Sequence, residues 1–245
     1  MKKSISAVLC VLCAAVTAFA LSAQANPDVV KKEFEKKYPG VIADKVTKAG
    51  FGELWEIFSG GEIVYTDEKV SFLLLGTLVN AANKENVTEK RLSKLTAINF
   101  NDLPLNNSIK LVRGDGSRKL AIFEDPNCGY CKRFERDLNS LDNITAYIFP
   151  YPILSPDSME KAKSVWCAPN RLQAWQDHML RDKAPASNTK CDNPIDAVFA
   201  YGQKQRIMGT PVTIFENGER ASGALPKEQL EARIAAASGK PVAPK

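Results

Sequence analysis

Two cysteines three positions apart are the residues of this sequence best suited to chemistry. Cys128 and Cys131 form the segment Cys128-Gly129-Tyr130-Cys131, which follows a β-prone run, Lys119–Phe123, and opens a helical stretch that ends at Leu138. A cysteine at a helix N-terminus is favoured as a thiolate, because the free N–H groups and the helix dipole stabilise the charge. Cys131 lies one turn later on the same face. The pattern predicts thiol–disulfide exchange, with Cys128 as the attacking and Cys131 as the resolving cysteine.

Other uses of a Cys-x-x-Cys pair fit this sequence less well. A structural zinc site needs further ligands, but the remaining cysteines are isolated and no His-x-x-x-His pattern occurs. A papain-type protease has its cysteine near the mature N-terminus and its histidine much farther downstream than His178. A purely structural disulfide does not need so tight a spacing at a helix start. We therefore expect no metal and no cofactor.

A second motif supports the redox interpretation. Gly209-Thr210-Pro211 directly precedes the predicted strand Val212–Phe215. Proline has no N–H for a strand ladder and is unusual at the start of a core strand. An isolated Thr-Pro pair is usually a trans turn, whereas a cis bond beside the cysteines would present the Thr210 backbone to a substrate chain. We predict a cis bond here, and we expect Thr210, Pro211, Gly129 and Tyr130 to support the cysteine pair and to contact the substrate.

The N-terminus carries the pattern of a secretory signal peptide. Lys2 and Lys3 precede an uncharged run, Ala7–Leu21, and Ala23-Gln24-Ala25 is a small-x-small cleavage site. The run is shorter than the roughly 20 apolar residues of a membrane span. We predict residues 1–25 to be a signal peptide cleaved after Ala25. Its short, lysine-led form is typical of bacteria, which indicates the periplasm.

Composition narrows the class of protein. Hydrophobic residues make up 44% and charged residues 25% of the 245 residues, which is typical of a globular chain and excludes a collagen-like or largely disordered one. The net charge of +5 is small and scattered, so we expect no nucleic acid partner. Removal of the signal peptide leaves four of the six cysteines, and an even number in an exported protein favours disulfides.

Residues 26–85 predict a small α+β domain. A helix begins at Asn26-Pro27-Asp28 and ends at Pro39-Gly40, and a hairpin joins Leu54–Ser59 to Glu62–Thr66. The apolar run Val70–Val79 predicts a bent strand or two short strands. A domain of this size buries little surface, so we expect it to oligomerise through an open strand edge.

Residues 86–104 predict a linker helix, and residues 105–238 predict a larger α/β domain. Asn86 and Glu89 form a capping signal for a polar helix that extends to Phe100, and Leu103-Pro104 ends it. The larger domain has the order βαβ, helices, β-hairpin, α. Its expected elements are Ile109–Val112, Lys119–Phe123, a helix to Leu138, Ile144–Phe149, Asp157–Trp166, Leu172–Arg181, Ile195–Lys204, Val212–Phe215, a short strand near Ala221, and Pro226–Ala237. Residues 239–245 are expected to be a flexible tail.

Four segments together resemble the DsbC/DsbG family of bacterial thiol:disulfide interchange proteins. They are Phe123–Cys131, Val165-Trp166-Cys167-Ala168, Cys191-Asp192 and Gly209-Thr210-Pro211. The resemblance covers essentially the whole mature chain and is most specific over residues 120–215. It implies a thioredoxin-like catalytic domain with a helical insertion, a linker helix and an N-terminal dimerisation domain. It further implies a homodimeric disulfide isomerase that acts on misfolded disulfide-containing periplasmic proteins and is kept reduced by a membrane thiol reductase of the DsbD type.

The other two cysteines, Cys167 and Cys191, lie in the predicted helical insertion and allow two interpretations. They could form a second redox-active pair or a structural disulfide. They lack Cys-x-x-Cys spacing and a helix-start position, which favours the structural disulfide, and the family resemblance implies the same. The only histidine, His178, lies in the same insertion beside Trp175. We expect it to be a surface or packing residue without a chemical role.

Three functions are consistent with these features. The first is a dimeric disulfide isomerase and reductase. The second is an oxidase that donates its disulfide through the same cysteines and needs no dimerisation domain. The third is a chaperone-like binding protein whose redox chemistry is secondary. The separate N-terminal domain and the linker favour the isomerase over the oxidase.

Overall fold

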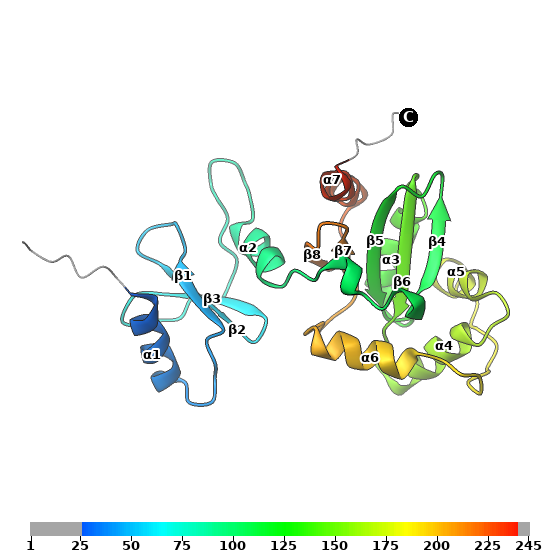
Figure 1. Ribbon diagram of the computed structural model, residues 1–245, viewed down its shortest axis with the longest axis horizontal. Coiled ribbons are helices and arrows are strands. Elements are labelled where there is room, and N and C mark those ends of the chain that lie inside the picture. Colours follow the sequence, from blue (N-terminus) through cyan, green and yellow to red (C-terminus); the bar gives the residue numbers. More distant parts are fainter. Residues whose placement is uncertain (1–25, 240–245) are drawn as a thin grey trace, which may run out of the picture.

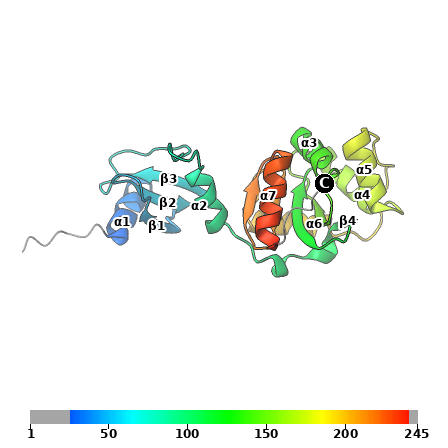
Figure 2. The ribbon, with the colours of Figure 1, turned by 90° about the horizontal axis from the view of Figure 1, so that it is seen from above.

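The computed structural model describes residues 26–239. The predicted signal peptide with its cleavage site, and residues 240–245 of the predicted tail, lie outside the described residues. Figures 1 and 2 show two bodies side by side along the long axis, joined by a segment that carries one short helix. Among residues 26–239, every helix is too short or too polar to cross a bilayer.

The N-terminal body packs one helix on a three-stranded antiparallel sheet. Helix α1 (Pro27–Lys37) begins where the Asn26 side chain accepts a hydrogen bond from the Asp28 N–H. The strands β1 (Lys45–Lys48), β2 (Trp55–Ser59) and β3 (Glu62–Thr66) lie in that order. The core consists of Val30, Phe34, Ala43, Val46, Trp55, Ile57 and Val70. The predicted hairpin around Gly60-Gly61 is confirmed, whereas β1 was not predicted because only one of its residues, Val46, is buried.

The predicted strand at Val70–Val79 is wrong. This segment makes only two isolated bridges, from Leu74 to Tyr65 and from Val79 to Asn86. Val70 has a φ of 51°, which turns the chain away from an extended path where the segment begins. The apolar side chains that follow are mostly exposed, so no layer of this body covers the segment as it would cover a core strand.

Helix α2 (Val87–Leu95) is shorter than the predicted helix. Asn86 caps it as expected by accepting the Glu89 N–H, but the helix ends at Leu95 rather than Phe100. The chain leaves the helix because Ile98 and Phe100 are buried in the core of the C-terminal domain. Two short 3-10 turns follow, at Phe100–Asp102 and Leu105–Asn107. The second half of the predicted linker is therefore part of the C-terminal domain.

The C-terminal domain is built on a five-stranded mixed sheet in the order β4-β6-β5-β7-β8. Its strands are β4 (Ile109–Arg113), β5 (Arg118–Glu124), β6 (Ile144–Pro150), β7 (Val212–Phe215) and β8 (Arg220–Ser222). Strands β5 and β6 are parallel and are joined by helix α3 (Gly129–Leu138), whereas the other neighbours are antiparallel. The predicted βαβ unit and the β7–β8 hairpin are confirmed.

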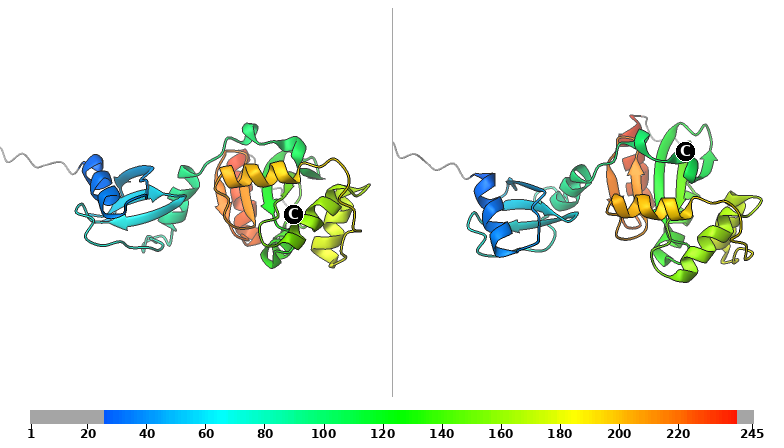
Figure 3. Two further views of the ribbon diagram at one scale, coloured as in Figure 1. Left: turned by 90° about the horizontal axis from the view of Figure 1, so that it is seen from below. Right: turned by 60° about the horizontal axis from the view of Figure 1, so that its bottom comes forward.

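Helices cover both faces of this sheet. Leu120 and Ile122 of β5 pack with α3 and α7 (Lys227–Ser238), and Ala121 and Phe123 pack on the opposite face with α6 (Ile195–Lys204). Helices α4 (Pro156–Trp166) and α5 (Arg171–Arg181) form the insertion between β6 and α6. They lie at the end of the domain farthest from the N-terminal body (Figure 3). Helix α5 contacts α3 and so reaches the cysteine pair from the side.

Candidate active site

The cysteine pair lies where β5 ends and α3 begins. Cys128 is the N-cap of α3, in an extended conformation, and its Sγ accepts a hydrogen bond from the Cys131 N–H at 3.3 Å. Both cysteines are free thiols. Cys128 keeps 6% of its surface exposed, and Cys131 is fully buried. A disulfide partner can therefore reach Cys128 but not Cys131.

The two sulfurs differ in acidity for reasons visible in the structure. The Cys131 thiol donates a hydrogen bond to Cys128 Sγ, and the backbone N–H groups of Cys131 and Tyr130 also stabilise the Cys128 thiolate. Burial opposes these effects, but together they lower the pKa of Cys128 to about 5. Burial and the neighbouring Cys128 sulfur raise the pKa of Cys131 well above its ordinary value. At neutral pH the Cys128 sulfur is a thiolate and the Cys131 sulfur is a thiol. This arrangement suits Cys128 for attack and Cys131 for resolution.

The Thr210–Pro211 peptide bond is cis, as predicted, and it lies against the cysteine pair. Cys128 Sγ is 3.4 Å from the Thr210 carbonyl oxygen, and Pro211 is buried at the head of β7. Gly129 is exposed, and Tyr130 is 68% exposed. The structure thus brings together two segments that are far apart in sequence, the start of α3 with Cys128, Gly129, Tyr130 and Cys131, and the loop before β7 with Thr210 and Pro211.

Asp125 holds the loop before Cys128, and sequence reasoning did not single it out. Its fully buried carboxylate accepts hydrogen bonds from the N–H groups of Asn127, Ile153 and Leu154 and from the Ser158 hydroxyl, at 2.7–2.9 Å. One carboxylate therefore fixes the loop that carries Cys128 against the start of the helical insertion. An acidic residue between an apolar strand and a proline is the signal that marks such a position.

The insertion also supplies two buried side chains to the back of the site. His178 Nε2 lies 2.8 Å from the Pro126 carbonyl oxygen. Burial lowers the pKa of His178, so the neutral ring can donate this hydrogen bond to the loop before Cys128. Trp175 Nε1 donates to the Glu135 carboxylate on α3 at 2.5 Å. His178 is a packing residue as expected, but it is buried against the active-site loop rather than exposed.

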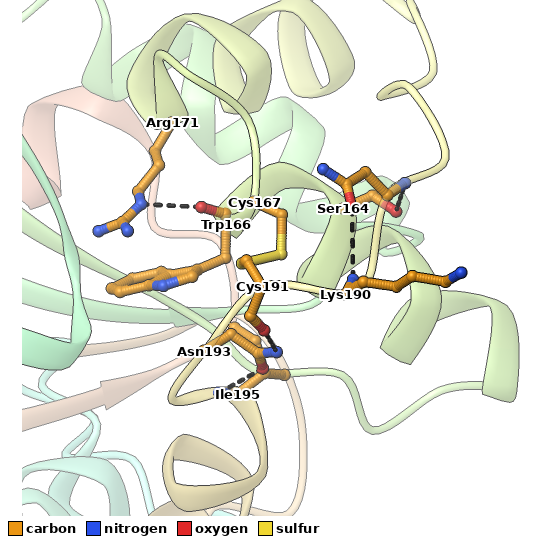
Figure 4. The surroundings of a disulfide bond; sticks show 9 residues. Ser164, Trp166, Cys167, Arg171, Lys190, Cys191, Asn193 and Ile195 are labelled. Atoms are coloured by element: carbon orange, nitrogen blue, oxygen red, sulfur yellow. Dashed lines mark hydrogen bonds between the residues drawn. A yellow bond between two sulfur atoms is a disulfide. The ribbon is translucent and has the colours of Figure 1, made fainter.

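Cys167 and Cys191 form a disulfide that closes the segment carrying α5. Figure 4 shows its surroundings: Arg171 stacks over the Trp166 ring at 4.0 Å and donates to the Trp166 carbonyl, and Asn193 donates to the Cys191 carbonyl. The pair has neither the helix-start position nor the Cys-x-x-Cys spacing of Cys128 and Cys131. The segment that it closes carries Trp175 and His178 on α5.

A βαβ unit with a cysteine pair at the start of its helix, faced by a cis-proline loop, defines a thioredoxin-like thiol–disulfide oxidoreductase. Comparison with known proteins agrees. Residues 105–238 match the family model of a thioredoxin-like domain, and residues 21–89 match that of the disulfide bond isomerase protein N-terminal domain.

Sequence similarity to named proteins identifies the family within this class. The chain is 44% identical over 216 residues to a probable thiol:disulfide interchange protein DsbC of Bordetella pertussis, covering 87% of this chain and 77% of the relative. It is 27% identical over 224 residues to the thiol:disulfide interchange protein DsbC of Escherichia coli K12, covering 88% and 90%. A crystal structure of a disulfide interchange protein from Neisseria gonorrhoeae is 40% identical, with a TM-score of 0.54, and the match covers 56% of this chain and 99% of that one. The chain belongs to the DsbC family of thiol:disulfide interchange proteins, and it is a disulfide isomerase.

Proposed function

We propose that this isomerase works as a homodimer in the bacterial periplasm and rearranges incorrect disulfides in exported proteins. In this proposal Cys128 attacks a substrate disulfide, Cys131 resolves the mixed disulfide, and Cys167–Cys191 is a structural disulfide. The observation that carries the dimer is the exposed apolar surface of the N-terminal body. An oxidase that only donates its disulfide has no need of this surface.

The exposed surface has the character of an interface. Phe72, Leu74, Leu75 and Val79 are all exposed, with Leu75 at 73%, although they form one short segment. This segment pairs with β3 only through the two hydrogen bonds between Tyr65 and Leu74, so most of its backbone N–H and C=O groups have no strand partner within this body. Apolar side chains beside an unpaired strand edge favour pairing with a second copy.

The surface around Cys128 suits an unfolded chain. Tyr130 in the first turn of α3 is exposed, as are the apolar side chains of Leu154 and Met208 on two loops, and Met208 is 78% exposed. An open groove next to Thr210 extends to the Gly60-Gly61 turn of the N-terminal body. An extended substrate segment that binds the Thr210 backbone could place apolar side chains on these residues. Misfolded exported proteins expose such side chains next to their incorrect disulfides.

The compartment, the reducing partner and the domain limits belong to the same proposal. The signal peptide is cleaved after Ala25, and a membrane thiol reductase of the DsbD type returns Cys128 and Cys131 to the thiol form that exchange requires. We place the N-terminal dimerisation domain at residues 26–85 and the catalytic domain from Ala97 onward, because Ile98 is buried in the catalytic core. Helix α2 forms the linker between them.

Refolding of a scrambled multi-disulfide protein tests the function, with the wild type and Cys128→Ala compared side by side. The isomerase restores native activity in the scrambled protein, and Cys128→Ala does not. A protein that oxidises reduced substrate but leaves scrambled substrate unchanged would be a disulfide donor. Equal recovery with Cys128→Ala would identify a chaperone-like binder. Sedimentation of the wild type measures the dimer independently.

A further inference from the structure

An ion pair joins the two bodies directly, without α2, and the thiol chemistry described so far does not use it. Arg206 Nη1 of the catalytic domain lies 2.9 Å from Asp44 Oδ2 of the N-terminal body. The same Asp44 oxygen accepts the Gly60 N–H at 3.2 Å. The two side chains are 51% and 32% exposed. The hydrogen bond from Arg206 lowers the pKa of Asp44 below its ordinary value, so both partners are charged at neutral pH.

Arg206 has an unusual backbone conformation. Its φ is 54°, in the left-handed region that residues with a Cβ rarely adopt and that glycine adopts freely. Arg206 follows the end of α6, and Figure 1 shows this end of α6 directed toward the N-terminal body. An arginine at a position where glycine would be less strained indicates that its side chain has a function.

The backbone around Arg206 is fixed to the catalytic domain. The Arg220 guanidinium on β8 donates to the carbonyl oxygens of Gln205 and Arg206, at 2.9 and 3.0 Å. The buried Tyr151 hydroxyl donates to the Ile207 carbonyl oxygen at 2.9 Å. Because this segment is held from the sheet side, the ion pair acts on the N-terminal body and holds that body against the catalytic domain.

Helix α2 makes a second connection between the bodies. Arg91 donates to the Glu56 carboxylate in the N-terminal body, and the Ser93 hydroxyl accepts the Arg220 backbone N–H in the catalytic domain. Two bodies joined through one short helix can still rotate about that helix. A second contact in another place prevents this rotation, and the ion pair provides it.

The groove next to Thr210 lies between the two bodies, and Arg206 is among the residues that line it. Its volume is about 400 Å³, within the range of ligand-binding sites. Gly60 and Gly61 of the β2–β3 turn line it from the N-terminal body, and Met208 and Thr210 line it from the catalytic domain. A Cβ at Gly61 would lie 3.7 Å from Arg206 Cδ, so this turn packs on the arginine side chain. The width of the groove therefore depends on the ion pair.

We propose that Arg206 is a positioning residue for protein substrates. Its ion pair with Asp44 holds the β2–β3 turn at a fixed distance from the cis-proline loop and keeps the groove at the width that binds an extended substrate segment. The inference rests on the proposed function, in which this groove holds the substrate while Cys128 exchanges with its disulfide. A small disulfide that reaches Cys128 without filling the groove does not depend on the pair.

Two reactions of the full-length protein separate positioning from chemistry. They are the refolding of a scrambled multi-disulfide protein and exchange with the small, uncharged disulfide of 2-mercaptoethanol. Asp44→Asn removes the charge but keeps an oxygen for the Gly60 N–H. Exposed ion pairs change an equilibrium by up to about fivefold, so we expect the KM for scrambled protein to rise about two- to fivefold at unchanged kcat. The rate with the small disulfide should equal that of the wild type.

Arg206→Gly separates the ion pair from the stability of the fold. Glycine relieves the left-handed backbone, so the Tm should not fall, whereas the KM for scrambled protein should rise as in Asp44→Asn. The double variant should have the KM of either single variant, because both changes remove one interaction. Glu53→Gln breaks an exposed ion pair with Lys48 inside the N-terminal body and is the matched control with an unchanged KM.

Salt and scattering give readouts that a local structural defect would not move. At about 1 M salt the Debye length is about 3 Å, so the ion pair is screened in the wild type as well. The ratio of the KM of Asp44→Asn to that of the wild type should therefore approach one. At low salt, small-angle X-ray scattering should give Asp44→Asn the larger radius of gyration, because the bodies lose their second connection.

Several results would overturn the proposal. They are a wild-type KM in both Asp44→Asn and Arg206→Gly, additive effects in the double variant, a KM ratio that does not change with salt, and an equal radius of gyration at low salt. An equal loss with the small disulfide would also overturn it, because the effect would then lie in the chemistry of Cys128. A wild type that cannot restore scrambled protein would instead contradict the proposed function, so the two failures are distinguishable.

Discussion

The Ile98 N–H donates a hydrogen bond to the Gly218 carbonyl oxygen at 3.0 Å, which ties the end of the linker to the β7–β8 turn. Gly218 has a φ of 85°, and a Cβ there would lie 2.8 Å from the Ile98 carbonyl oxygen. Only glycine allows this approach without a shift of the backbone. The N-terminal boundary of the catalytic domain is therefore fixed by a contact with the β7–β8 turn, which lies about 120 residues later in the sequence.

A chain that begins at Leu103 should be less stable than one that begins at Ala97. The shorter chain loses Ile98 and Phe100, both buried against the sheet. Loss of one large buried side chain costs about 3–5 kcal/mol, so we expect the free energy of unfolding to fall by at least about 3 kcal/mol. Urea unfolding of both chains measures the difference. Equal free energies of unfolding for the two chains would show that residues 97–102 belong to the linker rather than to the catalytic domain.

The chain that begins at Ala97 should be a monomer with reductase activity and little isomerase activity. It keeps the whole catalytic core but lacks the exposed apolar segment that we assign to the dimer interface. Sedimentation gives its oligomeric state, and insulin reduction and scrambled-protein refolding give the two activities. Undiminished refolding of scrambled protein by a monomer would show that the dimer is not needed.

Cys131→Ala should accumulate mixed disulfides with substrate proteins, whereas Cys128→Ala should form none. In Cys131→Ala the Cys128 sulfur can still attack, but no second thiol is present to release the substrate. Non-reducing gels after incubation with scrambled protein show the trapped species. Trapping by Cys128→Ala instead would reverse the roles of the two cysteines.

Alkylation of the reduced protein should reach half of its maximal rate near pH 5, where Cys128 titrates. Above that pH the thiolate reacts at a constant rate, and below it the rate falls about tenfold per pH unit, because the thiol is not the nucleophile. Because the folded pKa lies below the ordinary cysteine value of about 8.5, ionisation also stabilises the reduced fold. That contribution is complete above about pH 9 and is lost as the pH falls toward 5. An alkylation midpoint near the ordinary cysteine pKa would show that Cys128 is not a thiolate at neutral pH.

Asp125→Ala should strongly destabilise the catalytic domain. It leaves three part-buried backbone N–H groups and the buried Ser158 hydroxyl without their acceptor. The cost of such a loss is about 3–5 kcal/mol. Urea unfolding measures it, and Asp192→Ala, at an exposed aspartate, is the control. A change below 1 kcal/mol, a small fraction of the expected cost, would mean that water or the backbone replaces the carboxylate.

Local patterns predicted the catalytic fold well. The Cys-x-x-Cys pair, the proline at the head of β7 and the helix spacing each depend on neighbouring residues, and all of these elements were found. The wrong predictions are those in which tertiary contacts, rather than neighbouring residues, determine the local structure. Apolar residues at 70–79 read as a strand, but no layer within this body covers them, and Ile98 and Phe100 end α2 early because their core lies in the other domain. Glu135 of α3 and Trp175 of α5 are hydrogen bonded to each other, and only the folded chain reveals that they meet.

The four cysteines among residues 26–239 also pair in the order in which they occur in the chain. Cys128 has its redox partner three residues later, and the next cysteine, Cys167, is bonded to the last, Cys191. A chain that crosses a membrane N-terminus first exposes each pair in turn, so an oxidant that joins neighbours as they emerge forms only native links. In the proposed export to the periplasm, this pairing order lets an isomerase form its own disulfides without needing an isomerase.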